Sequence, residues 1–231
     1  MFGKVFAVGA VALASIALAA GPLNAAGEIG NVHLVKVWAY GTPTDGSQQP
    51  LYRADDLFAD ELVETVEDGA LHIRFLDNTK LRLGSASQVT LDSFVYDPST
   101  SAGELVADLG EGVFRFITGK LNNEGIEIRT PVAVIGVRGT DFIVSVAASG
   151  LTIVAVLSGI VTVTPRAAGA ATTTLTAGQG VTIDVAGDVT TGAAGPTDDT
   201  GLRDDAGIGS PDDAGIGGGR DKEQSSPSPS P

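Results

Sequence analysis

The sequence contains no cysteine and only two histidines, His33 and His72, among its 231 residues. Without thiols the chain cannot form disulfides, thiolate-ligated metal sites or a catalytic cysteine. With only two histidines, a histidine-rich metal centre is excluded as well. Aromatic residues make up 5% of the chain, with a single tryptophan, so the rings that commonly line ligand clefts are scarce. We therefore predict no metal site and no cofactor.

Basic residues are half as numerous as acidic ones, 14 against 28, which gives a net charge of −14. A chain this acidic is not expected to bind nucleic acid. The Gly-x-Ser-x-Gly string of a nucleophile elbow is absent. Two acidic pairs, Asp55-Asp56 and Asp60-Glu61, could serve a glycosidase, but they lie in an acidic stretch expected to be solvated. We predict that the protein is not an enzyme.

Only one long uncharged apolar run occurs, from Val5 to Ala20, directly after Lys4. Gly21-Pro22 ends this run, and small residues follow up to Ala26, which is the three-part pattern of a secretory signal peptide. The alternative is an uncleaved membrane anchor, but the run is shorter than the roughly 20 residues of a spanning helix. We predict a signal peptide over residues 1–26. The chain should then be exported to the periplasm or outside a bacterial cell, without a membrane span after cleavage.

The last forty residues are rich in Gly, Ala, Asp, Ser and Pro and poor in large apolar side chains. An Asp-Asp pair followed by Ala/Thr-Gly-Ile/Leu occurs three times, beginning at Asp198, Asp204 and Asp212. Such a segment has too little apolar area to offset the entropy of ordering, so residues 191–231 are predicted to be disordered. Weak calcium binding by the paired aspartates is the alternative, but the spacing of an EF-hand is absent.

The segment between the predicted signal peptide and the predicted tail alternates apolar and polar residues, with turn signals such as Asp77-Asn78 and Ser158-Gly159. We predict an N-terminal β segment and linker over residues 27–56 and a β domain over residues 57–190. About ten short strands favour an all-β fold, either a twisted two-sheet sandwich or a β-solenoid. A helix over Leu51–Val66 is a local alternative. Ile153–Leu157 is apolar throughout, which predicts a strand buried on both faces.

Two alternating strands flank the turn at Asp77-Asn78-Thr79, where Asn suits a left-handed conformation. We expect Phe75 to lie opposite Leu81 across this hairpin. Its outer face would then bring four basic side chains together: His72, Arg74, Lys80 and Arg82. The simpler interpretation is a solvated strand face beside the acidic stretch 64–68. The functional interpretation is a docking face for an acidic partner.

Residues 126–146 form the strongest local motif of the sequence. Its marked positions are Thr130, Pro131, Gly136, Arg138, Gly139 and Thr140. Proline lacks an amide donor and predicts an edge or corner, and the glycines on either side of Arg138 predict a tight bend or bulge. Arg138 is expected to be half-buried, with its guanidinium on carbonyls or on Asp141. We favour a structural role for this arginine, at a corner of the fold, over ligand binding.

At this motif the sequence resembles the FecR domain family, through the pattern TP-A-V-GVRGT-F-V. Further similar segments lie on both sides, in the order found in the family: 71–83, 84–98, 103–121, 152–163 and 175–179. Asn78 stands where the family usually has glycine. The resemblance covers about 130 residues, from Leu57 to Val185, and implies an all-β domain that works by binding.

Regulators that carry this domain also have a cytoplasmic sigma-factor-binding domain, a membrane helix and a C-terminal partner-binding region. We expect none of these here, because an apolar run begins at residue 5 and a polar segment follows Val189. The resemblance therefore implies a periplasmic protein-interaction or signal-sensing module without anti-sigma activity. Its partner would be another envelope protein. The alternative function is a structural, envelope-associated β protein.

Overall fold

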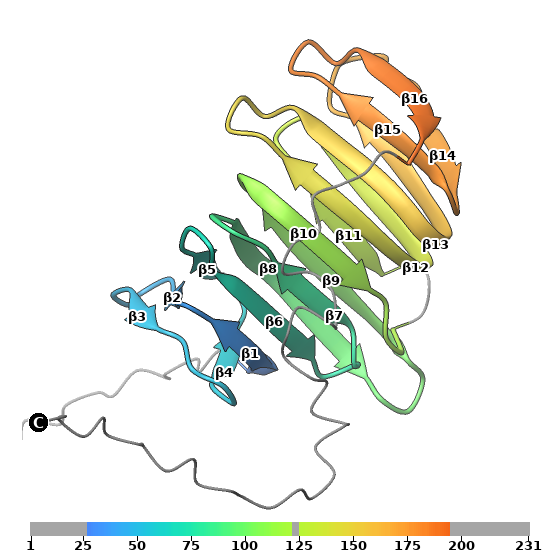
Figure 1. Ribbon diagram of the computed structural model, residues 1–231. Helices are drawn as coiled ribbons and strands as arrows, with labels where there is room; N and C mark the ends of the chain where they lie inside the picture. The colour runs from blue at the N-terminus through green and yellow to red at the C-terminus, as the bar shows by residue number, and fades with distance from the viewer. Residues whose placement is uncertain (1–26, 122–124, 195–231) are drawn as a thin grey trace, which may run out of the picture.

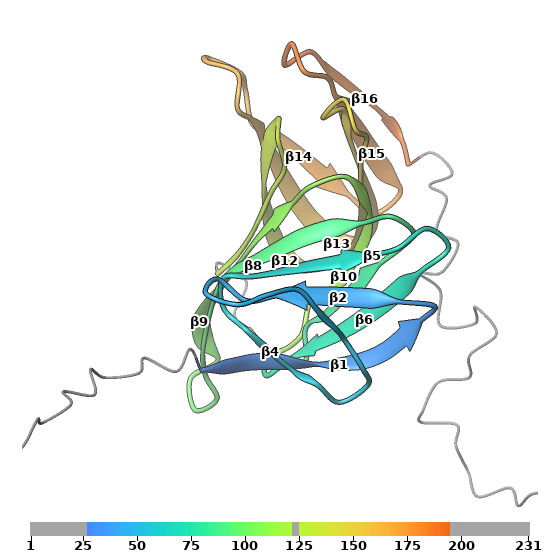
Figure 2. The ribbon, with the colours of Figure 1, turned by 90° about the vertical axis from the view of Figure 1, so that its left-hand side faces the viewer.

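The computed structural model describes residues 27–121 and 125–194, which contain sixteen β-strands and no helix (Figure 1). The predicted all-β class is therefore confirmed. All sixteen strands belong to one hydrogen-bonded sheet that curls on itself into an open half-barrel (Figure 2). This single curled sheet replaces the finer prediction of a two-sheet sandwich or a solenoid. The described part of the chain holds no helical segment with the length and hydropathy of a membrane span.

The curled sheet has two walls whose inner faces enclose the core. The first wall contains, in spatial order, β4 (Asp56–Phe58), β1 (Glu28–Lys36), β6 (Ala70–Phe75), β7 (Lys80–Leu83), β10 (Gly112–Ile117), part of β12 (Ala133–Val146), part of β13 (Thr152–Pro165), β15 (Gln179–Ile183) and β16 (Val189–Ala193). The second wall contains β3 (Gln49–Pro50), β2 (Ala39–Thr42), β5 (Glu61–Thr65), β8 (Gln88–Asp97), β9 (Ala102–Leu109), β11 (Ile126–Arg129), the remaining parts of β12 and β13, and β14 (Thr173–Thr176).

The core forms because the strands alternate buried and partly exposed residues, so that one face of each strand is apolar. Phe116 on β10 stacks on Phe142 of β12, with ring centroids 5.4 Å apart. Phe75 on β6 stacks on Phe94 of β8 at 5.5 Å, which joins the two walls across the interior. Aromatic pairs at such distances add stability beyond the area that they bury.

Strands β12 and β13 belong to both walls because each changes partners along its length. Residues 134–136 of β12 pair with β11 in the second wall, and residues 141–146 pair with β10 in the first. Strand β13 also changes partners: its residues 160–163 pair with β14, and its residues 152–155 pair with β15. The ladder between β12 and β13 is interrupted by register shifts between Arg138 and Phe142, where both strands cross from wall to wall.

Several predicted boundaries do not coincide with breaks in this structure. Residues 28–50 form β1, β2 and β3 of the same sheet, so residue 57 does not separate a linker from a domain. The helix considered for 51–66 is wrong, because β4 and β5 lie there. Strand β16 runs past the predicted boundary at 190. The predicted signal peptide lies outside the described residues, as does the tail beyond residue 194.

Candidate functional site

A row of basic side chains crosses the outer face of the first wall. His72 on β6 lies opposite Arg82 on β7, and Arg82 lies opposite Arg115 on β10. In the adjacent row Arg74 lies opposite Lys80. We call these five residues the basic face. It holds four of the ten Lys and Arg residues between positions 27 and 194, and is therefore a local concentration of positive charge on an acidic protein.

The hairpin register differs from the prediction by two residues. Leu81 lies opposite Ile73, not Phe75, and Phe75 instead donates its amide hydrogen to the carbonyl of Thr79 at 2.9 Å. Asn78 adopts the expected left-handed conformation, with φ of 67°. Because side chains alternate with a period of two, a shift of two keeps the same residues on the same face. The four predicted basic side chains therefore still lie together.

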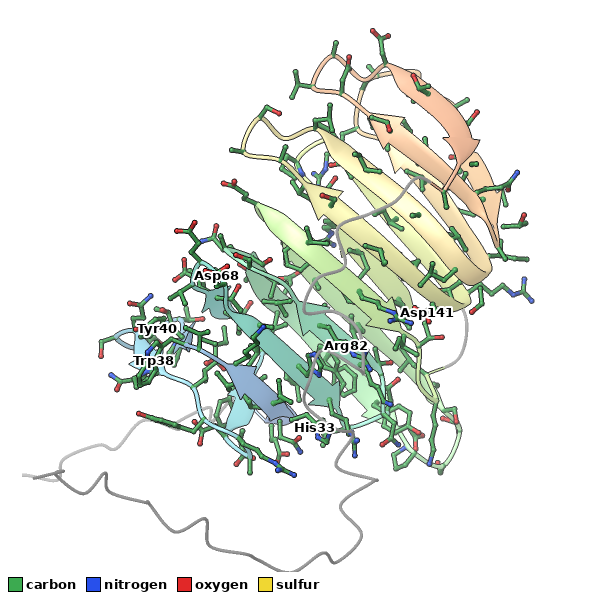
Figure 3. All side chains as sticks on the ribbon, viewed as in Figure 1. His33, Trp38, Tyr40, Asp68, Arg82 and Asp141 are labelled. Atoms are coloured by element: carbon green, nitrogen blue, oxygen red, sulfur yellow. The ribbon has the colours of Figure 1, made fainter. Side chains whose placement is uncertain are left out.

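The basic face is less exposed than a solvated strand face. Arg82 is only 3% exposed, which corrects the expectation that it lies in solvent (Figure 3). Arg115 forms a bidentate ion pair with Asp141, with Nε–Oδ1 at 2.9 Å and Nη2–Oδ2 at 2.7 Å. Its side chain is 17% exposed and that of Asp141 22%. Arg82 and Arg115 lie directly opposite one another, and the carboxylate of Asp141 offsets the charge of Arg115.

A buried carboxylate holds the β6–β7 turn that presents this face. Asp77 is fully buried and accepts the amide hydrogen of Thr79 at 2.9 Å and its hydroxyl hydrogen at 2.6 Å. It also accepts the amide hydrogen of Leu121 at 3.1 Å, and Thr79 Oγ1 accepts that of Gly119 at 3.0 Å. The turn is thereby fixed to the segment that follows β10, which sets the positions of β6, β7 and β10 relative to one another.

The residues of the 126–146 motif mark the point where β12 crosses between the walls. Pro131 is exposed in the turn between β11 and β12, next to the buried Thr130. A side chain at Gly136 would lie 2.7 Å from Thr162 Oγ1, and Gly139 has φ of 58°. The amide of Thr140 donates to Thr118 Oγ1 at 2.8 Å, which joins the crossing to the end of β10. This geometry is that of a backbone corner.

Arg138 does not occupy the position expected from the sequence. It is exposed on the bulge of β12, and the carboxylate of Asp141 receives the guanidinium of Arg115 instead. The bulge explains this difference, since the shifted register turns Arg138 outward before Asp141 comes to lie opposite Ile117 of β10. The predicted half-buried arginine at this corner is therefore wrong.

Two arginines that the sheet brings into ion-pair clusters are not predicted from the sequence. Arg115 joins the basic face only through the pairing of β7 with β10. Arg129, on the outer face of the second wall, contacts Glu127 at 2.6 Å and Asp92 at 2.9 Å. These carboxylates, with the Glu127 hydrogen bond first, raise the pKa of Arg129. Alternation places both arginines on outer faces, but long-range strand pairing selects their partners.

The acidic pairs considered for catalysis have local structural contacts. Asp55 accepts the amide hydrogen of Tyr52 at 2.7 Å within a turn. Glu61 is 4% exposed, which corrects the expectation of a solvated stretch, and it accepts the amide hydrogen of Phe58 at 3.1 Å. Burial raises the pKa of Glu61, while the Phe58 hydrogen bond acts in the opposite direction. Within residues 27–121 and 125–194, no group of three or more His, Asp or Glu could hold a metal ion.

Replacing Glu61 by Gln should stabilise the protein at neutral pH. Because folding raises the pKa of Glu61, the folded state holds more protons than the unfolded state, and stability falls as the pH rises through this raised pKa. We expect E61Q to raise the melting temperature at pH 7 by about 2–4 °C, the shift that about 1 kcal/mol produces at this size. The gain should disappear near pH 4. Melting curves of E61Q and of the control E64Q at both pH values test this, and an equal gain at pH 4 would contradict it.

Comparison with known proteins supports the resemblance seen in the sequence. Residues 61–162 match the family model described as FecR protein, which confirms that resemblance. Two solved structures, each described as a "putative anti-sigma factor" from Parabacteroides distasonis, are 17% identical in sequence, with TM-scores of 0.46 and 0.47. Each match covers 57% of this chain and 59% of the other. A search of curated proteins finds no match.

Proposed function

We propose that this chain is a non-catalytic, exported FecR-domain protein that acts as a protein-interaction or signal-sensing module in the periplasm or outside the cell. The FecR match supports a regulatory role for the β domain. The signal-peptide pattern of residues 1–26 supports export. The observation that carries the proposal is the basic face, because it is a specific charged surface built across three strands of an acidic protein.

The partner is an envelope protein with an acidic surface. The rest of this chain is acidic, with a net charge of −14 overall, and it repels such a partner everywhere except at the basic face. Attraction at one face and repulsion elsewhere would orient the encounter and raise the association rate more than the final affinity. Arg74 and Lys80 are partly exposed, so they are available for direct contact.

Neutralising the exposed cations should weaken partner capture. We expect the full chain with Arg74→Gln and Lys80→Gln to retain about a tenth or less of the partner that the unchanged chain captures from envelope extract. The reason is that each lost charge-assisted contact is worth roughly 1 kcal/mol. The readout is quantitative mass spectrometry after crosslinking at low salt.

A matched control replaces two exposed arginines away from the basic face, Arg53→Gln and Arg166→Gln. This variant has the same net charge as the test variant and should capture the partner as the unchanged chain does. An equal loss of captured partner in the two variants would mean that overall charge, and not the basic face, determines capture. No loss in the test variant would remove the basic face as the binding site.

A second candidate function is that of a structural, envelope-associated β protein. It is favoured by β16, whose five residues are all exposed and whose described ladder pairs it with β15. Such a strand at the edge of a sheet can accept another strand by main-chain pairing. In that role the captured protein would be a second copy of this chain, and the Arg74 and Lys80 substitutions would leave capture unchanged.

A further inference from the structure

The row that contains Arg82 continues across the whole outer face of the first wall. Beyond Arg115 on β10, the register places four residues in sequence on β12, β13, β15 and β16: Ile143, Ala155, Gly180 and Gly192. The side chains become smaller toward β16, and the last two positions have none. The outer face therefore carries a shallow strip of small residues, the glycine strip, which leads from β16 to the basic face.

The centre of this outer face is buried although its side chains point away from the core. Ile143 and Ala155 are each 2% exposed and Arg82 is 3% exposed. The described strands all lie in the two walls, and none of them is stacked over this face (Figures 1 and 2). Side chains on an uncovered sheet face next to glycines would be open to water. The low exposed fractions of Ile143, Ala155 and Arg82 are instead typical of a surface that is covered.

The chain leaves the sheet at the end of this strip. Strand β16 ends at Ala193, and residues 195–231 follow it in the sequence. Five strand spacings separate β16 from β7, which is about 24 Å at the usual distance between strands. An extended chain covers this span with roughly eight residues. Asp204-Asp205 lies ten residues beyond Ala194, within reach of Arg82.

The charge of this segment is complementary to the basic face. Residues 195–231 contain eight acidic and three basic residues, a net charge of −5. Six of the acids form the three Asp-Asp pairs, and each pair is followed four residues after its first aspartate by Leu or Ile: Leu202, Ile208 and Ile216. Adjacent carboxylates suit a row of cations, and an apolar residue at fixed spacing suits the neighbouring Ile143 and Ala155.

We propose that the acidic segment 195–231 docks on the glycine strip and the basic face of its own chain. A tethered segment has an effective concentration in the millimolar range, so even weak contacts occupy the surface. If the basic face is the partner site of the proposed function, on which this regulatory step rests, the segment competes with the acidic partner. Partner binding then requires displacement of the segment, which makes the site responsive to ionic strength.

A single spin label tests the docking without any partner. Because the chain has no cysteine, Ser210→Cys provides a unique labelling position in the full chain. We expect the label to reduce the amide NMR intensities of Arg82, Arg115 and Ile143 by more than half at low salt. Amides of β5 and β8 on the second wall should keep their intensities. Uniform broadening, or none, would overturn the docking.

Two variants of the labelled chain separate charge recognition from other causes. Replacing the six paired aspartates by asparagine should restore the intensities of Arg82, Arg115 and Ile143, whereas Arg129→Gln on the second wall should leave the broadening unchanged. Persistent broadening in the six-Asn chain would refute recognition by charge. Docking in the unchanged chain together with no partner capture by the six-Asn chain, whose segment no longer covers the site, would leave this inference standing and refute the proposed function. Capture without docking would do the reverse.

Discussion

Replacing Gly159 by Ala should destabilise the protein by at least about 3 kcal/mol, because a methyl group there meets the backbone of the neighbouring strand. Gly159 lies on β13, where both long strands cross between the walls. A Cβ at this position would lie 2.2 Å from the carbonyl oxygen of Gly139 and 2.8 Å from Cα of Thr140. Backbone atoms at a strand crossing cannot move aside without breaking the β12–β13 ladder. The measurement is the urea midpoint of the full chain.

Gly169→Ala is the matched control for this substitution. Gly169 has φ of 80° and Gly159 has φ of 84°, so the cost of a left-handed alanine is the same. No described atom lies within 4 Å of a Cβ built at Gly169. We expect a loss of about 1 kcal/mol there. Equal losses at the two glycines would show that the close approach at the crossing contributes nothing.

The sequence predicts the all-β class and the corner of β12 because both depend on local chemistry. Alternation of apolar residues identifies the strands regardless of their partners. The glycines at 136 and 139 identify a bend because a residue without Cβ most readily tolerates close approach or a positive φ. Asn is the side chain that most readily adopts the left-handed conformation after glycine, and Asn78 has φ of 67° in the β6–β7 turn. Each of these features is decided within a few residues.

The features that sequence analysis missed depend on pairings between distant strands. Arg115 lies opposite Arg82 only because β7 pairs with β10. Because of the bulge in β12, Asp141 forms its ion pair with Arg115 and not with Arg138. Curling of one sheet into a half-barrel likewise follows from where β12 and β13 change partners. Alternation shows on which face of the sheet a residue lies but not which residue lies beside it on the next strand. The prediction of four basic side chains therefore lacked Arg115.

The family motif and the basic face are connected through Asp141. This residue directly follows the Gly139-Thr140 corner, and the crossing of β12 brings its carboxylate to the guanidinium of Arg115 at 2.7 Å. A corner that is purely architectural in its own contacts thus sets the orientation of a cation on the candidate binding surface. Orienting a long side chain beforehand lowers the entropy cost of binding at that surface.

Replacing Asp77 by Asn should destabilise the protein by about 2–4 kcal/mol, because three donors converge on its carboxylate in a buried site. Asn keeps one acceptor oxygen and directs an NH2 group at the remaining donors. Neither orientation of the Asn side chain avoids this, since its NH2 group would face the amide hydrogen of Thr79 at the Oδ1 position or that of Leu121 at the Oδ2 position. Urea unfolding gives the loss in stability. Faster hydrogen exchange at Thr79 and Leu121 would localise it to the turn that holds the basic face.

Asp97→Asn is the control, because the same contacts occur there on an exposed hairpin. Asp97 accepts the amide hydrogen of Ser99 at 2.8 Å, its hydroxyl hydrogen at 2.6 Å and the hydroxyl hydrogen of Thr100 at 2.9 Å. Water can satisfy these donors after the substitution, so the urea midpoint should hardly change. A loss at Asp97 as large as that at Asp77 would mean that turn chemistry alone, and not burial between β6, β7 and the segment after β10, accounts for the role of Asp77.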